Sequence, residues 1–163
     1  MSGFLHLSDF HLVEDETLLS RAFNAKYILK NTIDKIIDKK KDFGNLDGVI
    51  ITGDISDDGS TTSYSDAYDI LKELNLPLLA IPGNHDLREP MMKYFAKDTN
   101  IQNPEFFDWV YETSDTLIIG LDTLVEGQNH GMLLSESLNL LFEKLSQPNE
   151  KNIILTIHHP PIN

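Results

Sequence analysis

The chain alternates between short apolar runs and longer stretches in which apolar residues recur every three or four positions. Four of the apolar runs are followed by polar residues, and they cover residues 4–7, 49–52, 78–81 and 153–157. Runs of this length, bounded by glycine, proline or charged residues, predict buried strands. Two more strands are predicted at 106–111 and 116–121, and the turn-like segment 112–115 between them indicates a hairpin, so the architecture is not purely parallel.

Helical spacing predicts a helix between most of these strands. The first apolar stripe contains Leu18, Ala22, Ala25, Leu29, Ile33 and Ile36, the second Tyr64, Ala67, Tyr68, Leu71 and Leu74, and the last Leu138, Leu141, Phe142 and Leu145. Pro90 suits the first residue of a short helix, and Ser135 is the predicted cap of the last one. Strands that alternate with helices predict a single α/β domain over residues 1–163.

A polar cluster follows each of the four buried runs. The clusters are Asp9-Phe10-His11, Gly53-Asp54, Gly83-Asn84-His85-Asp86 and His158-His159-Pro160-Pro161. If the first strand continues to its end, Asp9 and His11 leave it on the same face. Taken singly, each cluster also fits a turn that its own side chains stabilise. Together they predict one sheet edge rich in carboxylate, amide and imidazole groups, a mixture that suits two divalent metal ions and phosphate ester hydrolysis.

Each cluster contributes a different ligand chemistry. Asp54 follows a glycine that lets the backbone turn tightly, and its two oxygens could bridge two ions. Asn84 offers a neutral carbonyl oxygen and His158 an imidazole nitrogen. His6 has the opposite strand parity from Asp9, so we expect it to be a packed structural histidine.

Composition narrows the class of protein. The 163 residues are 40% hydrophobic and 24% charged, as in soluble globular proteins. There are no cysteines, which excludes disulfides, zinc-thiolate sites and thiol nucleophiles. A net charge of −13, from 13 basic and 26 acidic residues, argues against a nucleic-acid polymer as partner. The sequence shows neither a signal peptide nor a membrane span, so we expect no membrane association and a cytoplasmic location.

The ordered motifs Asp-x-His, Gly-Asp, Gly-Asn-His-Asp and His-His-Pro-Pro resemble those of the calcineurin-like metallophosphoesterase superfamily, over residues 5–161. Finer features include Leu-Ser-Asp-x-His, Ile-Pro-Gly-Asn-His-Asp-Leu-Arg, and Leu-Asp-Thr before a loop that ends in His130-Gly131-Met132-Leu133. These are similar to class III cyclic nucleotide phosphodiesterases and glycerophosphodiesterases. The resemblance implies an α/β fold with a two-layer sandwich of mixed β-sheets flanked by helices.

The resemblance also implies a mechanism. The ligands that it implies are Asp9, His11 and Asp54 for one metal ion, and Asp54, Asn84 and His158 for the other. A hydroxide between the ions would attack phosphorus, His85 would donate a proton to the departing alkoxide, and Asp86 would orient the His85 ring. Oxygen and nitrogen ligands admit manganese, iron, zinc or magnesium, so the identity of the two divalent ions stays open.

Three further residues have two interpretations each. Arg88 could hold a substrate oxygen or form a surface ion pair. His130 could reach the substrate from its loop or be an exposed loop histidine. His159 could support His158 from outside the ligand set or simply begin the turn.

The superfamily also carries a later Gly-His-x-His motif, which this sequence lacks. Each metal ion therefore keeps three of the implied ligands, counting the shared Asp54 twice. We expect a C-terminally truncated form of a longer enzyme, weakly active and with an uncovered sheet edge or apolar face. The favoured function is a phosphodiesterase for a small soluble ester of the cyclic nucleotide or glycerophosphodiester type. Two alternatives stay open: a phosphomonoesterase, or a catalytically impaired scaffold that binds a partner or a second copy as a homo-oligomer.

Overall fold

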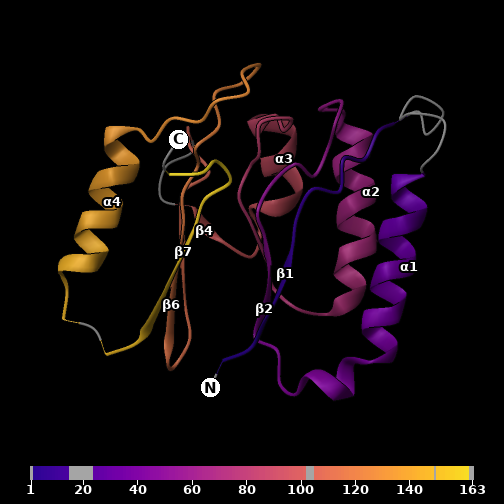
Figure 1. The fold of residues 1–163 in the computed structure, drawn as a ribbon, viewed down its shortest axis with the longest axis horizontal. Coiled ribbons are helices and arrows are strands. Elements are labelled where there is room, and N and C mark those ends of the chain that lie inside the picture. The colour runs from indigo at the N-terminus through magenta and orange to yellow at the C-terminus, as the bar shows by residue number, and fades with distance from the viewer. Residues whose placement is uncertain (1, 15–23, 102–104, 149, 162–163) are drawn as a thin grey trace.

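The computed structural model describes residues 2–14, 24–101, 105–148 and 150–161 (Figure 1). The strands are β1 (Phe4–Leu7), β2 (Gly48–Ile51), β3 (Leu78–Ala80), β4 (Asn100–Ile101), β5 (Trp109–Glu112), β6 (Thr116–Gly120) and β7 (Asn152–Thr156). The α-helices are α1 (Ala25–Asp38), α2 (Thr61–Leu71), α3 (Arg88–Phe95) and α4 (Ser135–Ser146), with short 3₁₀ helices at Lys40–Phe43 and Lys72–Leu74. The order of elements is the alternating one that the sequence predicts.

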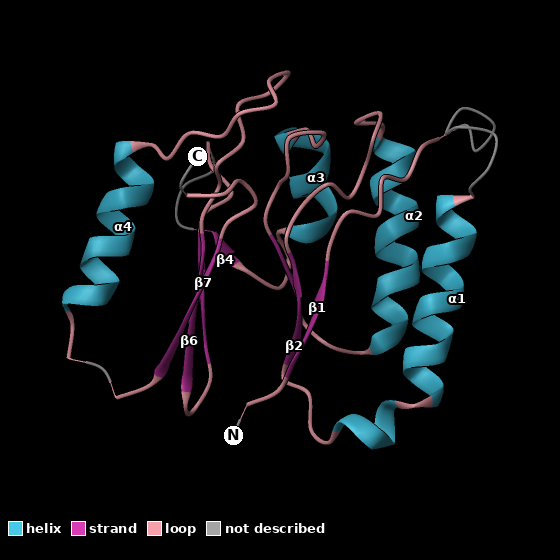
Figure 2. Cartoon of the chain, viewed as in Figure 1, coloured by secondary structure: helices cyan, strands magenta, loops and turns pink. Residues whose placement is uncertain are grey.

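The first sheet has the strand order β1-β2-β3 and is entirely parallel. Its central strand β2 is buried at every residue, which explains why its sequence is a continuous apolar run rather than an alternating one. Helices α1 and α2 lie on its outer side (Figure 2). Leu29 and Ile33 of α1 and Tyr64 and Leu71 of α2 belong to the same core cluster as Val49 of β2.

The second sheet has the strand order β4-β5-β6-β7 and is mixed. Strands β5 and β6 pair antiparallel, with Val110 opposite Ile119, which confirms the predicted hairpin. Strand β7 pairs parallel to β6, with Ile154 beside Ile118. Helix α4 lies on the outer side of this sheet (Figure 1).

The two sheets pack face to face and share one main core. Trp109 of β5 is fully buried, and its indole N–H donates to the carbonyl oxygen of Ala80 in β3 over 2.5 Å. The layers are therefore helices, parallel sheet, mixed sheet and helix. This arrangement confirms the predicted sandwich of sheets flanked by helices.

The carboxyl ends of β1, β2, β3, β6 and β7 reach the same edge of the molecule, at the top in Figure 1. The polar clusters predicted from the sequence follow these ends. Strand β7 is one of the two edge strands of its sheet as described, and Ile153 and Leu155 are each 46% exposed on it. Among the described residues, none of the helices has the length and apolar content needed to cross a membrane.

Some local predictions are wrong. Helix α4 begins at Ser135 itself, Leu134 occupies the cap position, and no side-chain capping bond forms there. Helix α3 begins at Arg88, so Pro90 is its third residue, still within the first turn where a missing N–H costs no helical bond. His6 is exposed rather than packed, and its Nε2 lies 2.9 Å from Thr52 Oγ1. Leu18 and Ala22 of the first predicted stripe lie outside the described residues.

Candidate metal centre

Asp9 and His11 reach the sheet edge through a left-handed turn rather than by continuing the strand. Strand β1 ends at Leu7, and Asp9 and His11 have φ angles of 59° and 48°. Such angles are uncommon outside glycine and persist where the surroundings fix them. Here the backbone N–H groups of Asp9 and His11 donate to the carbonyl oxygens of Gly53 and Asp54, each over 3.0 Å. The two side chains still converge, because His11 Nε2 lies 3.8 Å from Asp9 Oδ1.

Asp54 lies at the middle of the cluster and is only 4% exposed. Its Oδ2 lies 3.6 Å from His11 Nε2, and its Oδ1 lies 3.6 Å from His158 Nε2. Asp54 therefore presents one oxygen to each half of the predicted ligand set. This position suits the bridging role predicted for Asp54 from the sequence, which stays a prediction.

Two glycines allow the loop that carries Asp54 to lie close to the loop that follows β3. A Cβ on Gly53 would lie 2.4 Å from Gly83 N, and a Cβ on Gly83 would lie 2.2 Å from Asp54 Oδ1. The φ of Gly53 is +94°, which a larger residue rarely adopts. The loops after β2 and β3 can approach each other this closely only because both positions lack a side chain.

The imidazole of His158 is oriented by the backbone. Its Nδ1 lies 2.7 Å from the carbonyl oxygen of Thr52, which can only accept, so Nδ1 carries the hydrogen. In the neutral ring Nε2 then presents its lone pair, and it lies 3.1 Å from Asn84 Oδ1. Two electron-pair donors that face the same point form an arrangement that a shared cation would stabilise.

Asp57 is a residue of this cluster that the sequence analysis missed. Its Oδ1 lies 3.0 Å from Nδ1 of His11 and 3.0 Å from Nδ1 of His85. The two rings meet edge to face, with centroids 4.9 Å apart. The only sequence signal is its position three residues after Asp54. It is brought here by the isolated bridge between Leu12 and Ser56, a contact between two loops that the sequence pattern does not reveal.

Asp86 does not orient the His85 ring, so the role predicted for it is wrong. Its carboxylate oxygens accept hydrogen bonds from the backbone N–H groups of Ile55, Ser56 and Gly83 and from the Tyr64 hydroxyl, over 2.9 to 3.3 Å. Burial raises the pKa of Asp86, while these hydrogen bonds oppose the rise. Asp86 thus joins the turn that carries His85 to the loop that carries Asp54, and Asp57 is the carboxylate that holds the His85 ring.

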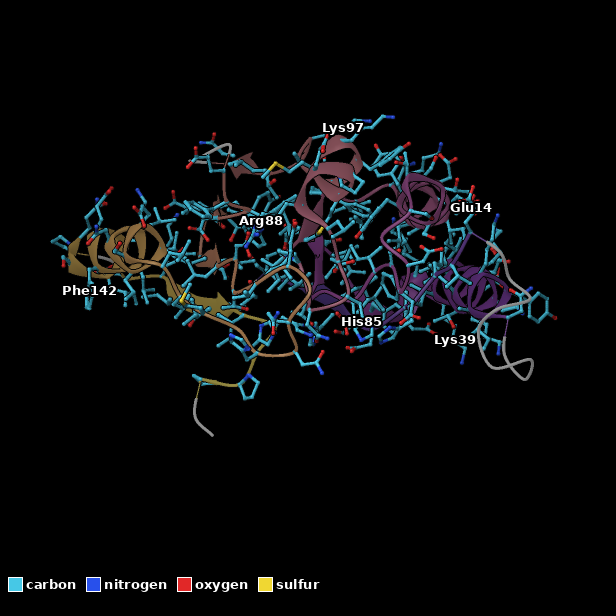
Figure 3. All side chains as sticks on the ribbon, turned by 90° about the horizontal axis from the view of Figure 1, so that it is seen from above. Glu14, Lys39, His85, Arg88, Lys97 and Phe142 are labelled. Carbon is cyan, nitrogen blue, oxygen red and sulfur yellow. The ribbon has the colours of Figure 1, made fainter. Side chains whose placement is uncertain are left out.

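Arg88 is bound by a buried carboxylate. Its Nε and Nη2 donate to the two oxygens of Asp122 over 2.6 and 3.0 Å, and Nη2 also donates to the carbonyl oxygen of Leu124. Asp122 is 3% exposed and the Arg88 side chain 21%, so this is a partly buried bidentate ion pair rather than the surface pair considered from the sequence. Figure 3 views the site from above and labels Arg88 and His85.

His130 and His159 line the same cavity, of about 370 Å³, with Asn129, Gly131, Pro160 and Pro161. His130 is exposed, in the loop that precedes α4. The Nδ1 of His159 lies 2.7 Å from Thr123 Oγ1, and its ring packs edge to face on that of His158, with centroids 5.1 Å apart. Burial lowers the pKa of His159, and the neighbouring His158 lowers it further.

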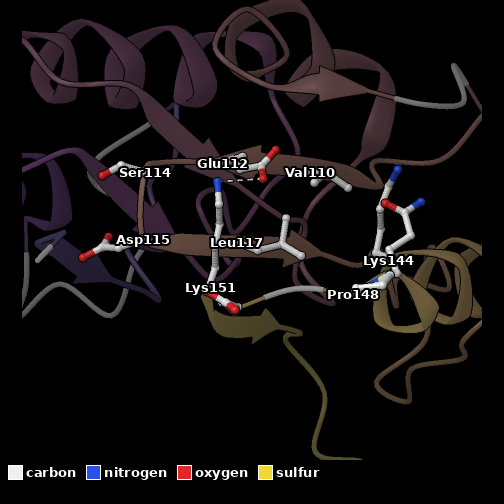
Figure 4. Close-up of a pocket in the computed structure, with 10 residues that line it drawn as sticks. Val110, Glu112, Ser114, Asp115, Leu117, Lys144, Pro148 and Lys151 are labelled. Carbon is white, nitrogen blue, oxygen red and sulfur yellow. Dashed lines mark ion pairs between the residues drawn. The ribbon is translucent and has the colours of Figure 1, made fainter.

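A different cavity, of about 580 Å³, lies at the opposite end of the second sheet (Figure 4). It is lined around the turn between β5 and β6, and the ion pair of Lys151 with Glu112, 2.8 Å long, crosses it. Its described lining includes none of the predicted site residues. The predicted site residues lie instead at the carboxyl edge.

The residues present fit a pair of divalent cations. Ligand atoms of Asp9, His11 and Asp54 all lie within 4.8 Å of one another, and Asn84 and His158 face the other oxygen of Asp54. The set combines carboxylate, imidazole and amide groups, which suits manganese, iron, zinc or magnesium. Two ions about 4 Å apart could connect carboxylates that are up to roughly 12 Å apart. The ligand oxygens of Asp9 and Asp54 are much closer, within 4.8 Å of each other.

A sequence profile of the calcineurin-like phosphoesterases matches residues 3–163, so the chain belongs to this family. It is 32% identical to the probable glycerophosphodiester phosphodiesterase of Arcobacter nitrofigilis, over 97% of this chain and 57% of that protein. It is 30% identical to a cAMP/cGMP dual specificity phosphodiesterase of Mycobacterium tuberculosis, over 97% of this chain and 49% of that protein. A 3',5'-cyclic adenosine monophosphate phosphodiesterase of Pseudomonas aeruginosa is 25% identical, over 97% and 55%.

The crystal structure of the protein TT1561 of Thermus thermophilus has the same fold, with a TM-score of 0.53 and 17% identity over 98% of this chain and 70% of that one. The chain spans about half the length of the curated relatives that it matches.

Proposed function

We propose that this chain carries the metal-binding and catalytic residues of a phosphodiesterase, which hydrolyses a small soluble phosphate diester with the help of two divalent metal ions. One observation carries the proposal: the two oxygens of the buried Asp54 lie 3.6 Å from the Nε2 atoms of His11 and His158, one each. The carboxylate accepts a hydrogen bond from the backbone N–H of His85 over 3.0 Å, and a cation would offset the remaining cost of burying its charge.

The first ion would be held by Asp9, His11 and Asp54, and the second by Asp54, Asn84 and His158. When bound, the ions would lower the pKa of water and neutralise charge on the phosphoryl oxygens. The protein's own contribution is to hold the ligands. Asp57 fixes the ring of His11, and the Thr52 carbonyl oxygen fixes that of His158, so each Nε2 faces the cluster.

His85 is the residue proposed to transfer a proton. Its Nδ1 is held by Asp57, and its side chain is 42% exposed, which leaves the ring accessible to a substrate. A histidine oriented by a carboxylate at one nitrogen can donate a proton to the departing alkoxide from the other. Asp57 stabilises the protonated ring before the transfer and holds the tautomer afterwards.

A diester is favoured over a monoester by the relatives, which are named for cyclic nucleotide and glycerophosphodiester hydrolysis. We expect manganese-dependent hydrolysis of a bis-aryl phosphodiester that exceeds hydrolysis of the corresponding aryl monoester. Asp54→Ala and His85→Ala should each lower the rate by about 10²-fold or more. Asp42→Ala, an exposed carboxylate in the Lys40–Phe43 turn, serves as the matched control. No metal-dependent hydrolysis by the wild type, or unchanged rates in both site variants, would refute the proposal.

A scaffold function is a second candidate, favoured by the exposed Ile153 and Leu155 on the edge strand β7. Such an edge can pair with another chain. If the protein is a scaffold, sedimentation at increasing concentration should reveal self-association that Ile153→Lys abolishes. A monomer at all concentrations that hydrolyses the diester would exclude this alternative for self-assembly.

A further inference from the structure

Residues 123–132 form a closed loop beside the metal centre. The Met132 N–H donates to the carbonyl oxygen of Thr123 over 3.0 Å, which joins the two ends of the loop. Within the loop, the Gln128 N–H donates to the carbonyl oxygen of Val125 over 2.9 Å. In Figure 1 the loop, drawn in orange, extends beyond the sheet edge that carries the site.

The loop is anchored on its first side by Arg88, three residues after His85 in the chain. The Arg88 guanidinium binds Asp122 just before the loop, and the Arg88 N–H donates to Glu126 Oε1 over 3.0 Å. The segment that carries the proposed proton donor and the start of this loop are therefore tied together.

On its second side the loop rests against the ring of His159. Its Nδ1 is paired with Thr123 Oγ1 over 2.7 Å. Gly131 approaches the same ring so closely that an added Cβ would lie 2.3 Å from Cγ and 2.4 Å from Nδ1 of His159. The ring therefore sets the position of both the first and the next-to-last residue of the loop.

The space between this loop and Pro160 and Pro161 is the cavity of about 370 Å³. The described residues that line it include no carboxylate, although the chain as a whole has a net charge of −13. His159 separates it from His158, since the two rings are in edge-to-face contact. A group bound there would lie next to the metal centre without facing its acidic ligands.

We propose that His159 is a positioning residue, which fixes the 123–132 loop so that the adjoining cavity receives the organic group of the phosphate ester. The proposal rests on the function proposed above, because it assigns part of that substrate to the cavity. His159 touches no reacting atom in this account; it acts through Thr123 and Gly131.

The test is a double-variant cycle. Gly131→Ala must displace the loop by about 1 Å to relieve its contact with His159, and we expect the KM for the bis-aryl diester to rise about tenfold with little change in kcat. Gly127→Ala is the matched control in the same loop, since a Cβ there meets nothing within 4 Å and only its φ of +76° opposes the change. Its effect on KM should be much smaller.

His159→Ala removes the two closest contacts of a side chain at position 131, with Cγ and Nδ1 of the ring, and leaves only the contact with the Cβ of residue 159 at 2.7 Å. We therefore expect His159→Ala alone to raise KM about as much as Gly131→Ala, and the double variant to raise it by less than the product of the two single effects. His159→Asn keeps a polar group for Thr123 and should restore part of the wild-type KM. Additive effects, or equal KM values for His159→Asn and His159→Ala, would overturn the proposal.

Two measurements work without turnover. Amide hydrogen exchange of residues 123–132 should be faster in His159→Ala, and the calorimetric affinity for Mn²⁺ should stay at the wild-type value. A parallel loss of Mn²⁺ affinity would mean that His159 serves His158 rather than the loop, and would contradict the proposal. If the wild type hydrolyses no diester, the proposed function fails, whereas unchanged exchange in His159→Ala is the outcome that rejects the positioning role.

Discussion

Replacing Asp9 with asparagine is expected to stabilise the metal-free protein and to destabilise the metal-loaded one. If the Asp9 carboxylate contributed only to the stability of the fold, its replacement would change that stability in the same direction with and without metal. The opposite signs follow from the cluster itself, in which oxygens of Asp9 and Asp54 lie within 4.8 Å of each other. Without a cation these two charges repel, and with one they share it.

The size of the repulsion follows from Coulomb's law. Two unit charges 4.8 Å apart repel by about 3.5 kcal/mol at an effective dielectric constant near 20 and by about 1 kcal/mol in water. The Asp9 side chain is 55% exposed, so solvent screening brings the value toward the lower limit, about 1–2 kcal/mol. For a domain of this size that corresponds to a rise in Tm of about 3–6 °C in the metal-free variant.

In the loaded state the balance reverses. Loss of one ligand should weaken Mn²⁺ binding by at least about 10–100-fold, which removes about 1.4–2.7 kcal/mol of ligand-linked stability at saturating metal. Thermal melts at about pH 8, where an ordinary histidine is neutral, would be recorded with a chelator and with added Mn²⁺. Asp42→Asn is the matched control and should change neither melt. A lower Tm for Asp9→Asn in chelator, or an undiminished Mn²⁺ shift, would refute the reasoning.

Two further predictions concern the other carboxylates. Asp57→Asn should lower the rate of diester hydrolysis about 10²-fold with little loss of stability. Asp86→Asn should cost about 3 kcal/mol of stability, because the amide nitrogen that replaces one carboxylate oxygen cannot accept from the buried N–H groups and places donor against donor. Kinetics and urea unfolding of both variants would separate them, and the reverse pattern would contradict our assignment. Partial burial would raise the pKa of Asp58, but hydrogen bonds from Glu14, Ser60 and two serine hydroxyls lower it to about 2. Because the folded pKa lies below the ordinary value, this stability is present above about pH 4 and is lost as pH falls toward 2. Asp58→Asn should abolish that part of the acid transition, and an unchanged transition would refute the role.

The sequence predicts which residues meet at the proposed centre because these residues follow buried strands. Apolar runs locate β1, β2, β3 and β7 to within about two residues, the accuracy expected of such patterns. Parallel strands deliver their carboxyl ends to one edge, so the residues after them must meet. Asp54 and Asn84 can therefore be expected to lie close together without any knowledge of the loops between them.

Asp9 and His11 converge for a different reason from the one that the sequence pattern predicts. A persisting strand would place them on one face by alternation, but the structure uses two left-handed residues held by the carbonyl oxygens of Gly53 and Asp54. Left-handed backbone at aspartate or histidine leaves no reliable mark in a single sequence. The periodicity of the sequence therefore predicts that the two side chains lie close together, but it does not predict the local backbone structure.

The residues whose roles were missed or misassigned are those that connect one loop to another. Asp57, Asp86 and Arg88 each bind groups that are distant in sequence: a histidine 46 residues away for Asp57, the Ile55 amide 31 residues away for Asp86, and Asp122, 34 residues away, for Arg88. Side chains that accept from backbone N–H groups need no particular partner residue, so no motif records them. The Asp that directly follows His85 in the chain is the obvious orienting group, yet its oxygens are already used by the backbone. Candidate ligands can be predicted from the positions where strands end. The residues that orient them depend on which loops are in contact, and those contacts are determined by packing across the whole sheet edge.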